Sequence, residues 1–322
     1  MSLRISTAPH IRKGVTTQKV MLHVLIALVP CVIAGIYRFG FGAALLLAIS
    51  MCTAMLAELI FQKLAKKPVT TNDLSALLTG LIVGLNLPPQ APWWLAVVGS
   101  AFAIILVKQL FGGIGDNFMN PAMAARAVLL ASWPVHMTKF IAPINGNFGA
   151  DVISGATQLT AINSVNSPLT LSGADLFNHF TGNIPGAIGE VSKAMIVLGL
   201  VYLLLTRVIT WHIPVTMVAS AALMSLILGG DPLSNIVSGG LLFGAVYMAT
   251  DYTTSPMTKK GQVIFGAGCG IFVCIIRKYG AYPEGVTYAI LFMNCLTPLL
   301  DKFIRPRVYG AEKKQKEAKA DA

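Results

Sequence analysis

The sequence predicts an all-α integral membrane protein with about ten transmembrane helices, arranged as two inverted five-helix repeats with short broken helices. Three observations indicate this fold. The chain has 322 residues, of which 55% are hydrophobic and only 11% are charged, whereas soluble domains are about 25% charged. Its apolar residues form runs that approach the roughly 20 residues a helix needs to cross a bilayer. Glycine-rich segments also recur at matching places in the two halves.

Each predicted span is an apolar run that ends at charged residues, glycine or proline. Basic residues precede the first run, as in a signal peptide, but no small-residue cleavage site follows and we expect it to remain as a span. Trp93 and Trp94 open the fourth run, and tryptophan favours the membrane interface. The ten predicted spans are 20–37, 41–61, 74–87, 93–111, 118–133, 194–209, 213–229, 236–250, 263–277 and 285–304.

The third and eighth spans carry the repeat. Both are short, and their glycines share one spacing: Gly80 and Gly84 in the third, Gly240 and Gly244 in the eighth. An odd number of spans in each half would invert the second repeat relative to the first. Inverted repeats with broken helices place binding sites near the membrane midplane. The alternative is that these glycines only allow close helix packing.

Basic residues set the expected orientation, because lysine and arginine favour the cytoplasmic side. The net charge is +11, and both chain ends and the connections after the second and eighth spans are basic. Segment 135–190 has a single lysine, Lys139, and is expected to face outward, although Arg277 and Lys278 fall on that side too. The predicted regions are an N-terminal membrane repeat (1–134), an extracytoplasmic loop (135–190), a C-terminal membrane repeat (191–304) and a charged cytoplasmic tail (305–322).

The cysteines and histidines do not predict a metal site. None of the five cysteines forms a C-x-x-C pair, and the five histidines show no ligand spacing. No basic stripe is interleaved with aromatic residues, so the positive charge is assigned to lipid headgroups and not to nucleic acid. The sequence also has no dinucleotide fingerprint and no P-loop.

The long polar loop contains "DVISGAT" at 151–157. Its residues form turns readily, which explains the composition but not the length of the loop. A serine nucleophile is not indicated, because the G-x-S-x-G elbow is absent and no histidine or acid is arranged around the serine. We therefore assign no catalytic residue.

This stretch resembles the D-x-x-S-G-A-T signature at which a flavin transferase attaches FMN to threonine through a phosphoester bond. "RISTAPHIRKG", "GGIGDNFMNPAMAARA" and the long stretch that begins "YMATDYTTSP" resemble the D subunit of the Rnf electron transport complex. They are less similar to its homologue, the B subunit of the sodium-pumping NADH:quinone oxidoreductase. The resemblance runs nearly end to end. One departure is "TDYTTSP", where a proline is expected directly after the aspartate.

The resemblance implies a role for each residue of the attachment motif. Thr157 would bear the FMN, with Thr160 and Ser154 as rival acceptors. Recognition by the transferase would involve the other motif positions, because small residues let a bulky partner approach the backbone. These positions are Asp151, Ser154, Gly155 and Ala156.

The resemblance also implies a second, non-covalent flavin, riboflavin, among the helices. The candidate site is "GDNFMNP", where Asn117 and Asn120 are three residues apart and are expected to share one helical face. Their amides could bond the edge of an isoalloxazine ring. Alternatively, or in addition, Asn120 caps the helix that starts at Pro121.

Glu58, Arg126 and Asp251 are charged residues in or at the end of predicted spans, where charge is costly and often functional. We favour structural pairing over ion transport for each. Arg126 faces either a partner helix or a flavin. Glu58 is expected to snorkel or to pair with Lys63, and Asp251 to hold cavity backbone.

The function that the resemblance implies is electron relay through flavins within a larger assembly. That assembly would move electrons between ferredoxin and NAD, coupled to Na⁺ or H⁺ translocation across the bacterial inner membrane. Expected partners are the A, B, C, E and G subunits of the Rnf complex, the flavin transferase and membrane lipid. The alternatives are a small-solute channel or transporter, which inverted repeats also suit, and a passive scaffold. Whether the isolated chain is an enzyme stays open.

Overall fold

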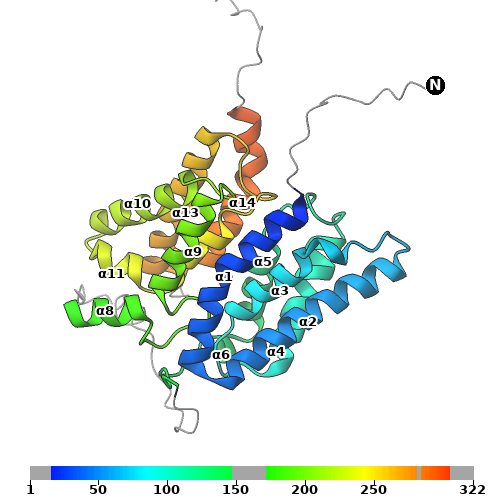
Figure 1. Cartoon of the computed structure of the whole chain (residues 1–322). Helices are drawn as coiled ribbons and strands as arrows, with labels where there is room; N and C mark the ends of the chain where they lie inside the picture. The colour runs from blue at the N-terminus through cyan, green and yellow to red at the C-terminus, as the bar shows by residue number, and fades with distance from the viewer. Residues whose placement is uncertain (1–15, 147–171, 281–283, 305–322) are drawn as a thin grey trace, which may run out of the picture.

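The computed structural model describes residues 16–146, 172–280 and 284–304. Within these ranges the protein is helical and contains no β-strand. The N-terminal half and the C-terminal half lie side by side, and α1 runs between them (Figure 1). The all-α prediction is therefore confirmed.

The N-terminal half contains two long helices followed by shorter ones. A single glycine, Gly40 (φ 80°), ends α1 and starts α2, because its positive φ allows the sharp reversal. The elements are α1 (Thr17–Phe39), α2 (Phe41–Leu64), η1 (Thr71–Asp73), α3 (Ser75–Leu85), α4 (Trp93–Phe102) continued by the π-helix η2 (Ala103–Gln109), α5 (Pro121–Ser132) and α6 (Pro134–Met137).

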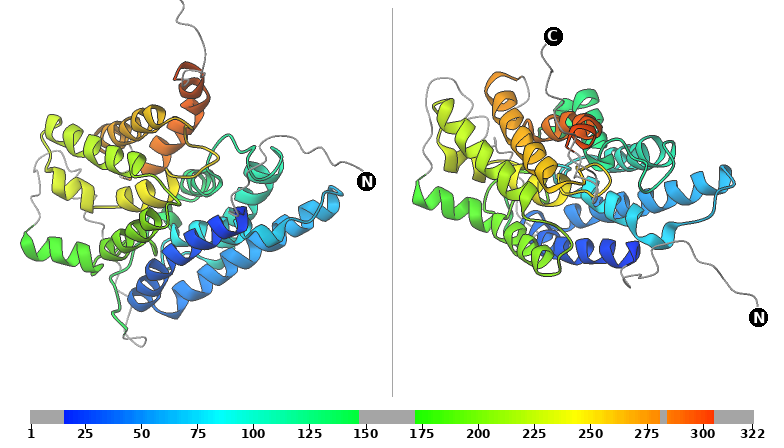
Figure 2. Two further views of the ribbon diagram at one scale, coloured as in Figure 1. Left: turned by 45° about the horizontal axis from the view of Figure 1, so that its top comes forward. Right: turned by 90° about the horizontal axis from the view of Figure 1, so that it is seen from above.

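The C-terminal half is built around α13 and is seen from two further directions in Figure 2. Its predicted eighth span is broken into three pieces, α11, α12 and η3. The elements are α8 (Gly173–Thr181), α9 (Lys193–Leu205), α10 (His212–Ile227), α11 (Pro232–Val237), α12 (Leu241–Phe243), the π-helix η3 (Gly244–Met248), α13 (Lys259–Tyr279) and α14 (Val286–Phe303).

Three of these helices, α1, α2 and α13, are long and apolar enough to cross a membrane by themselves. The 11 residues of α3 extend only about 16 Å at 1.5 Å per residue, which is about half of the hydrocarbon core. Large apolar side chains face outward on α1 and α2, as Ile33 and Leu64 do at 62% and 79% exposure. These features fit a membrane protein with short helices, and the count of ten spans stays a prediction.

The two halves contact each other through equivalent elements. The first helix of one half, α1, packs on the first span of the other, α9, and α5 packs on α14. Two of the repeated glycines allow close packing. A Cβ on Gly80 would lie 2.7 Å from the Ala54 Cβ, and one on Gly244 would lie 2.6 Å from a Val286 methyl. Close helix packing and an internal repeat are therefore compatible readings of these glycines.

The end of the predicted loop 135–190 does not lie on the surface. Ile188 N–H donates to Leu87 O at 3.2 Å, and Gly189 N–H donates to Leu85 O at 2.8 Å. Gly35 lets this segment approach α1, because a Cβ there would lie 2.6 Å from Ile188. The segment 182–192 thus re-enters the core between the two halves, with its backbone groups bonded to the end of α3 as buried polar groups require.

Candidate functional site

A cavity of about 800 Å³, its open mouth included, lies where the two halves meet. Its walls come from the first turns of α1, from α3, from the residues leading into α5 and from the segment that follows η3. Polar side chains on its wall include Ser75, Thr79, Lys108, Asn117, Asn120, Thr250, Asp251 and Thr253.

Asn120 is the N-cap of α5. Its Oδ1 accepts hydrogen bonds from Ala122 N–H at 3.0 Å and Met123 N–H at 3.2 Å, and Pro121 occupies the first helical position. Its Nδ2 donates to Met248 O at 3.1 Å, at the end of η3. The capping prediction is confirmed, and this one amide also joins the two halves across the cavity wall.

Asn117 does not share a helical face with Asn120, because α5 begins only at Pro121 and Asn117 lies in the preceding loop. That expectation was wrong: proline stops the helix from extending backwards. The loop turns through Gly112, Gly113 and Gly115, all at positive φ, and brings Asn117 to the cavity.

The Asn117 carboxamide suits a ligand with a hydrogen-bond donor. The residue is 9% exposed, and its Oδ1 is buried with no hydrogen-bond partner. A buried acceptor without a partner costs free energy unless a bound group satisfies it. The imide N–H of an isoalloxazine ring is one such group.

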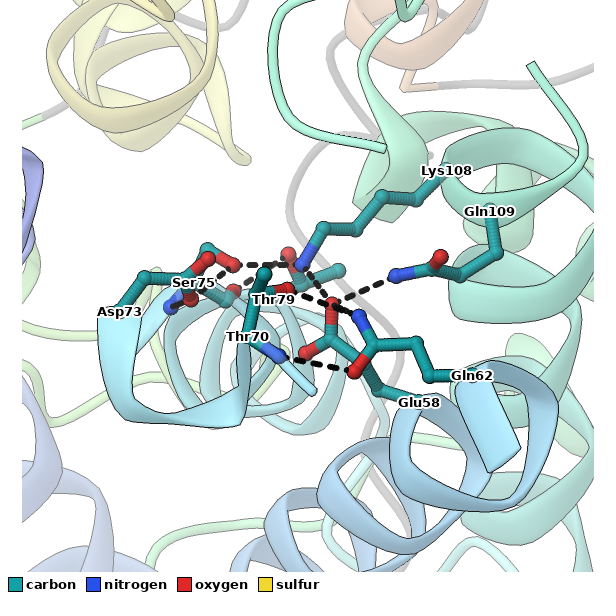
Figure 3. A network of polar contacts seen from close by, with 8 residues as sticks. All are labelled: Glu58, Gln62, Thr70, Asp73, Ser75, Thr79, Lys108 and Gln109. Atoms are coloured by element: carbon teal, nitrogen blue, oxygen red, sulfur yellow. Dashed lines mark hydrogen bonds and ion pairs between the residues drawn. The ribbon is translucent and has the colours of Figure 1, made fainter. Parts of the chain in front are cut away.

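A buried polar network lies beside the cavity and includes three of its lining residues, Ser75, Thr79 and Lys108 (Figure 3). Lys108 Nζ donates to Glu58 Oε1 at 2.7 Å and to the Ser75 hydroxyl. Gln109 Nε2 donates to the same Glu58 oxygen at 2.6 Å. Glu58 is fully buried and Lys108 is 2% exposed, so each charge requires its partner.

The prediction that Glu58 snorkels or pairs with Lys63 was therefore wrong. Lys63 is exposed, whereas Lys108 reaches Glu58 from η2 across the interface with α2. Asp251 behaves as expected: its carboxylate accepts from the hydroxyls of Thr253 and Thr254 at 2.9 and 3.3 Å and holds the backbone that follows η3.

Arg126 lies on α5 but does not line the cavity. One guanidinium nitrogen donates to Asn86 Oδ1 at 2.6 Å, and another donates to the carboxylate of Glu284, directly before α14. Arg126 therefore contacts a partner element, which was one of the two expectations, and a contact with a flavin stays a prediction.

The attachment motif, Asp151, Ser154, Gly155, Ala156 and Thr157, lies outside the described residues. The residues on either side of it are placed at the C-terminal end of α1. Ile144 N–H donates to Arg38 O at 2.7 Å, and Asn145 Nδ2 donates to Asn183 Oδ1 at 2.9 Å.

The cavity and these loop flanks are therefore at opposite ends of α1. The cavity contacts Val20 and the loop contacts Arg38, a separation of about 27 Å along the helix axis at 1.5 Å per residue. In the parts of the chain that the structure describes, no group of three or more His, Cys, Asp or Glu side chains could hold a metal ion.

Comparison with known proteins agrees with the resemblance seen in the sequence. The chain is 46% identical over 321 residues to the D subunit of the Na⁺-translocating ferredoxin:NAD⁺ oxidoreductase complex of Acetobacterium woodii, with 99% of each chain covered. It is 39% identical over 321 residues to the D subunit of the proton-translocating ferredoxin:NAD⁺ oxidoreductase complex of Clostridium ljungdahlii, with 96% of each covered.

A third relative, the D subunit of the ion-translocating oxidoreductase complex of Halorhodospira halophila, is 37% identical over 335 residues, with 94% of each chain covered. The sequence model described as the NQR2, RnfD, RnfE family matches residues 4–310, nearly the whole chain. This chain therefore belongs to the NQR2, RnfD, RnfE family.

Proposed function

We propose that this chain is the flavin-carrying membrane subunit of an Rnf-type complex that relays electrons between ferredoxin and NAD, coupled to Na⁺ or H⁺ translocation. The names of its relatives support the assembly and the reaction. The observation that supports the flavin role is a cavity with a buried, unpartnered amide oxygen near one end of α1, while the residues that lead into the attachment-motif segment are bonded to the other end.

The loop site holds FMN on Thr157 through a phosphoester bond, which the match of "DVISGAT" to the transferase signature supports. Asp151, Ser154, Gly155 and Ala156 form the recognition sequence around the acceptor hydroxyl. Because the residues that lead into this segment are bonded to the end of α1, we expect the flavin to be tethered at that face of the protein.

The cavity site takes riboflavin without a covalent bond. Asn117 offers its free Oδ1 to the imide N–H of the ring, while Asn120 holds the start of α5 and the end of η3 in place. Apolar residues on the remaining wall, such as Leu78, Ile82 and Val246, exclude water. When bound, flavins supply one- and two-electron transfer, which no side chain of this chain provides.

The membrane setting and the partners follow from the same assignment. The protein lies in the bacterial inner membrane with both termini in the cytoplasm, as the basic residues of its ends predict. Its partners are the A, B, C, E and G subunits of the complex, which supply the iron–sulfur and NADH-binding parts, and a flavin transferase that loads Thr157.

Flavin content tests the proposal. The full chain is co-produced with the transferase, purified and run on a denaturing gel, where covalent flavin fluoresces under ultraviolet light. Thr157→Ala should abolish this band, whereas Thr160→Ala, the nearby hydroxyl outside the recognition sequence, should retain it as the matched control. Persistence of the fluorescent band in Thr157→Ala would refute the site.

A second candidate function is a small-solute channel or transporter, which the cavity between the two halves favours. A transporter has no use for covalent flavin. A colourless, unmodified chain that conducts or exchanges a solute in vesicles would support the transporter and exclude the electron relay.

A further inference from the structure

Two glutamates from distant parts of the chain face each other beside Gly240. Glu190 belongs to the buried segment before α9, and Glu284 directly precedes α14. A Cβ on Gly240 would lie 2.7 Å from Glu190 Oε2 and 2.7 Å from Glu284 Oε1. At most twice that distance therefore separates the two oxygens, and only the missing side chain of Gly240 leaves room for both.

The oxygens that face each other are the ones without a partner. Glu190 Oε1 accepts from Ala187 N–H at 3.1 Å, and Glu284 Oε2 accepts from Arg126. Glu190 Oε2 and Glu284 Oε1 are both buried without a hydrogen-bond partner, and Glu190 as a whole is 6% exposed. Two unpartnered acceptors that converge in a buried place require a donor between them.

The neighbouring cations do not supply that donor. Lys193 Nζ donates to Glu190 O and to Gly239 O. Neither of the two ion pairs found within the described ranges includes Glu190. The charged and titratable groups that face the pair are Arg126 from α5, Lys193 from α9 and Arg277 from α13, with Cys31 of α1 beyond Lys193.

A metal cation is a poor candidate for this position. Three cationic side chains surround the two carboxylates and would repel it, and Arg277 already engages the carbonyl oxygens of Asn235 and Ser238 that might otherwise coordinate it. A proton needs no coordination shell. A proton bound to one of the two facing carboxyl oxygens makes that group a hydrogen-bond donor to the oxygen of the other carboxylate. Neither oxygen is then left without a partner.

We propose that Glu190 and Glu284 form a proton-binding site, in which one proton on Glu190 Oε2 is donated in a hydrogen bond to Glu284 Oε1. The bond joins the segment before α9 to the start of α14. Through the ion pair of Glu284 with Arg126 it also reaches α5 in the N-terminal half. The proposal does not depend on either flavin.

The titration of the pair supports this assignment. Both residues precede their helices and lie outside the spanning segments. Burial, with the nearby Glu284 carboxylate, raises the pKa of Glu190 to about 8. Burial also opposes ionisation of Glu284, but the charges of Arg126 and Arg277 and the hydrogen bonds with Glu190 and Arg126 together outweigh it, so the pKa of that carboxyl is lowered. Glu190 is therefore the member that holds the proton at neutral pH.

The sign of the pH dependence follows. A carboxyl whose pKa is higher in the folded protein than in the unfolded chain binds more protons when folded. Its contribution to stability is complete below the unfolded value of about 4.5 and falls as the pH rises to about 8. Above that pH two like charges face each other at Gly240, and the contact weakens.

Infrared spectroscopy of the purified full-length protein tests the proposal. The carbonyl stretch of a protonated carboxylic acid should be present at neutral pH and should disappear with a midpoint near pH 8. It should be absent in Glu190→Gln, whose amide can donate to Glu284 in place of the proton. Asp116→Asn, the same acid-to-amide change at an exposed carboxylate, should keep the band.

Thermal unfolding between pH 5 and pH 9 provides the second readout. The unfolding temperature of the wild type should fall across this range, and that of Glu190→Gln should fall less. Absence of a titrating carboxylic acid band in the wild type would overturn the proposal without any variant. So would a band, or a pH response, that Glu190→Gln leaves unchanged.

Discussion

Lys108 and Glu58 form an ion pair of 2.7 Å that solvent does not reach, with exposed side-chain fractions of 2% and 0%. The pair joins η2 to α2; Lys108 also donates to the Ser75 hydroxyl, and Gln109 donates to the same Glu58 oxygen as Lys108 (Figure 3). Because Lys108 also lines the cavity, this pair fixes one wall of the candidate flavin site.

Removing one partner of this pair should destabilise the protein strongly. Lys108→Met leaves the Glu58 carboxylate buried without a counter-charge, which costs about 3–5 kcal/mol. Combining it with Glu58→Leu should recover much of that loss, because no charge then remains buried. Thermal unfolding in detergent measures both effects. Lys63→Met is the matched control. Lys63 is an exposed lysine on α2, the helix that carries Glu58, and its replacement should change stability little.

The two asparagines of the cavity should separate ligand binding from folding. Asn117→Ala should lower riboflavin retention and leave unfolding nearly unchanged, because the Asn117 Oδ1 has no partner within the protein. Asn120→Ala should lower both, since it removes the helix cap, at a cost of about 1 kcal/mol, and the bond to Met248. Extracted flavin per chain and unfolding temperature are the two measurements. Equal flavin retention in Asn117→Ala and wild type would remove Asn117 from the site.

Close packing of α3 on α2 should make Gly80 intolerant of any side chain. In Gly80→Ala the new methyl group would lie 2.7 Å from Ala54 Cβ and 2.8 Å from Ser50 O, and such overpacking costs about 1–3 kcal/mol. Gly42→Ala, where nothing lies within 4 Å of the new Cβ, should instead stabilise α2 slightly. Under one condition, the unfolding temperature should fall in Gly80→Ala and rise slightly in Gly42→Ala. A change in the same direction in both variants would contradict the close packing at Gly80.

The orientation is testable by chemical labelling. After replacement of the exposed Cys52 and Cys295, a single cysteine at Ala174 should react with a membrane-impermeant maleimide added to intact cells. A single cysteine at Lys67 should react only after the cells are opened. Both positions are exposed, so accessibility depends on the side of the membrane. Labelling of Lys67→Cys in intact cells would show that the orientation is the reverse of the one predicted.

Local signals in the sequence predicted the fold class and the Asn120 cap well. Apolar runs and breaks at glycine and proline depend on residues close in sequence, and Asn120-Pro121 is itself a helix start signal. Partners far apart in sequence were not predicted. Glu58 and Lys108 are 50 residues apart, and Arg126 and Glu284 are 158 apart. Packing within the N-terminal half brings the first pair together, and packing of the two halves brings the second pair together.

The buried end of the loop was missed for a related reason. Segment 182–192 is rich in small and polar residues, which is typical of surface loops. The structure instead buries it, because Gly189 accepts the close approach of Leu85 and the backbone finds partners at the end of α3. The sequence did carry one indication that this region is buried for a reason. Glu190 lies near the end of the segment and Lys193 directly follows it, and ionisable residues in a buried place often mark functional sites.

The mass of the intact chain tests the central claim most directly. When the protein is co-produced with a flavin transferase, its mass should exceed that of the polypeptide by one FMN joined with loss of water, and the peptide containing Thr157 should carry all of the increase. An unmodified mass under these conditions, or an FMN found on another peptide, would contradict the account.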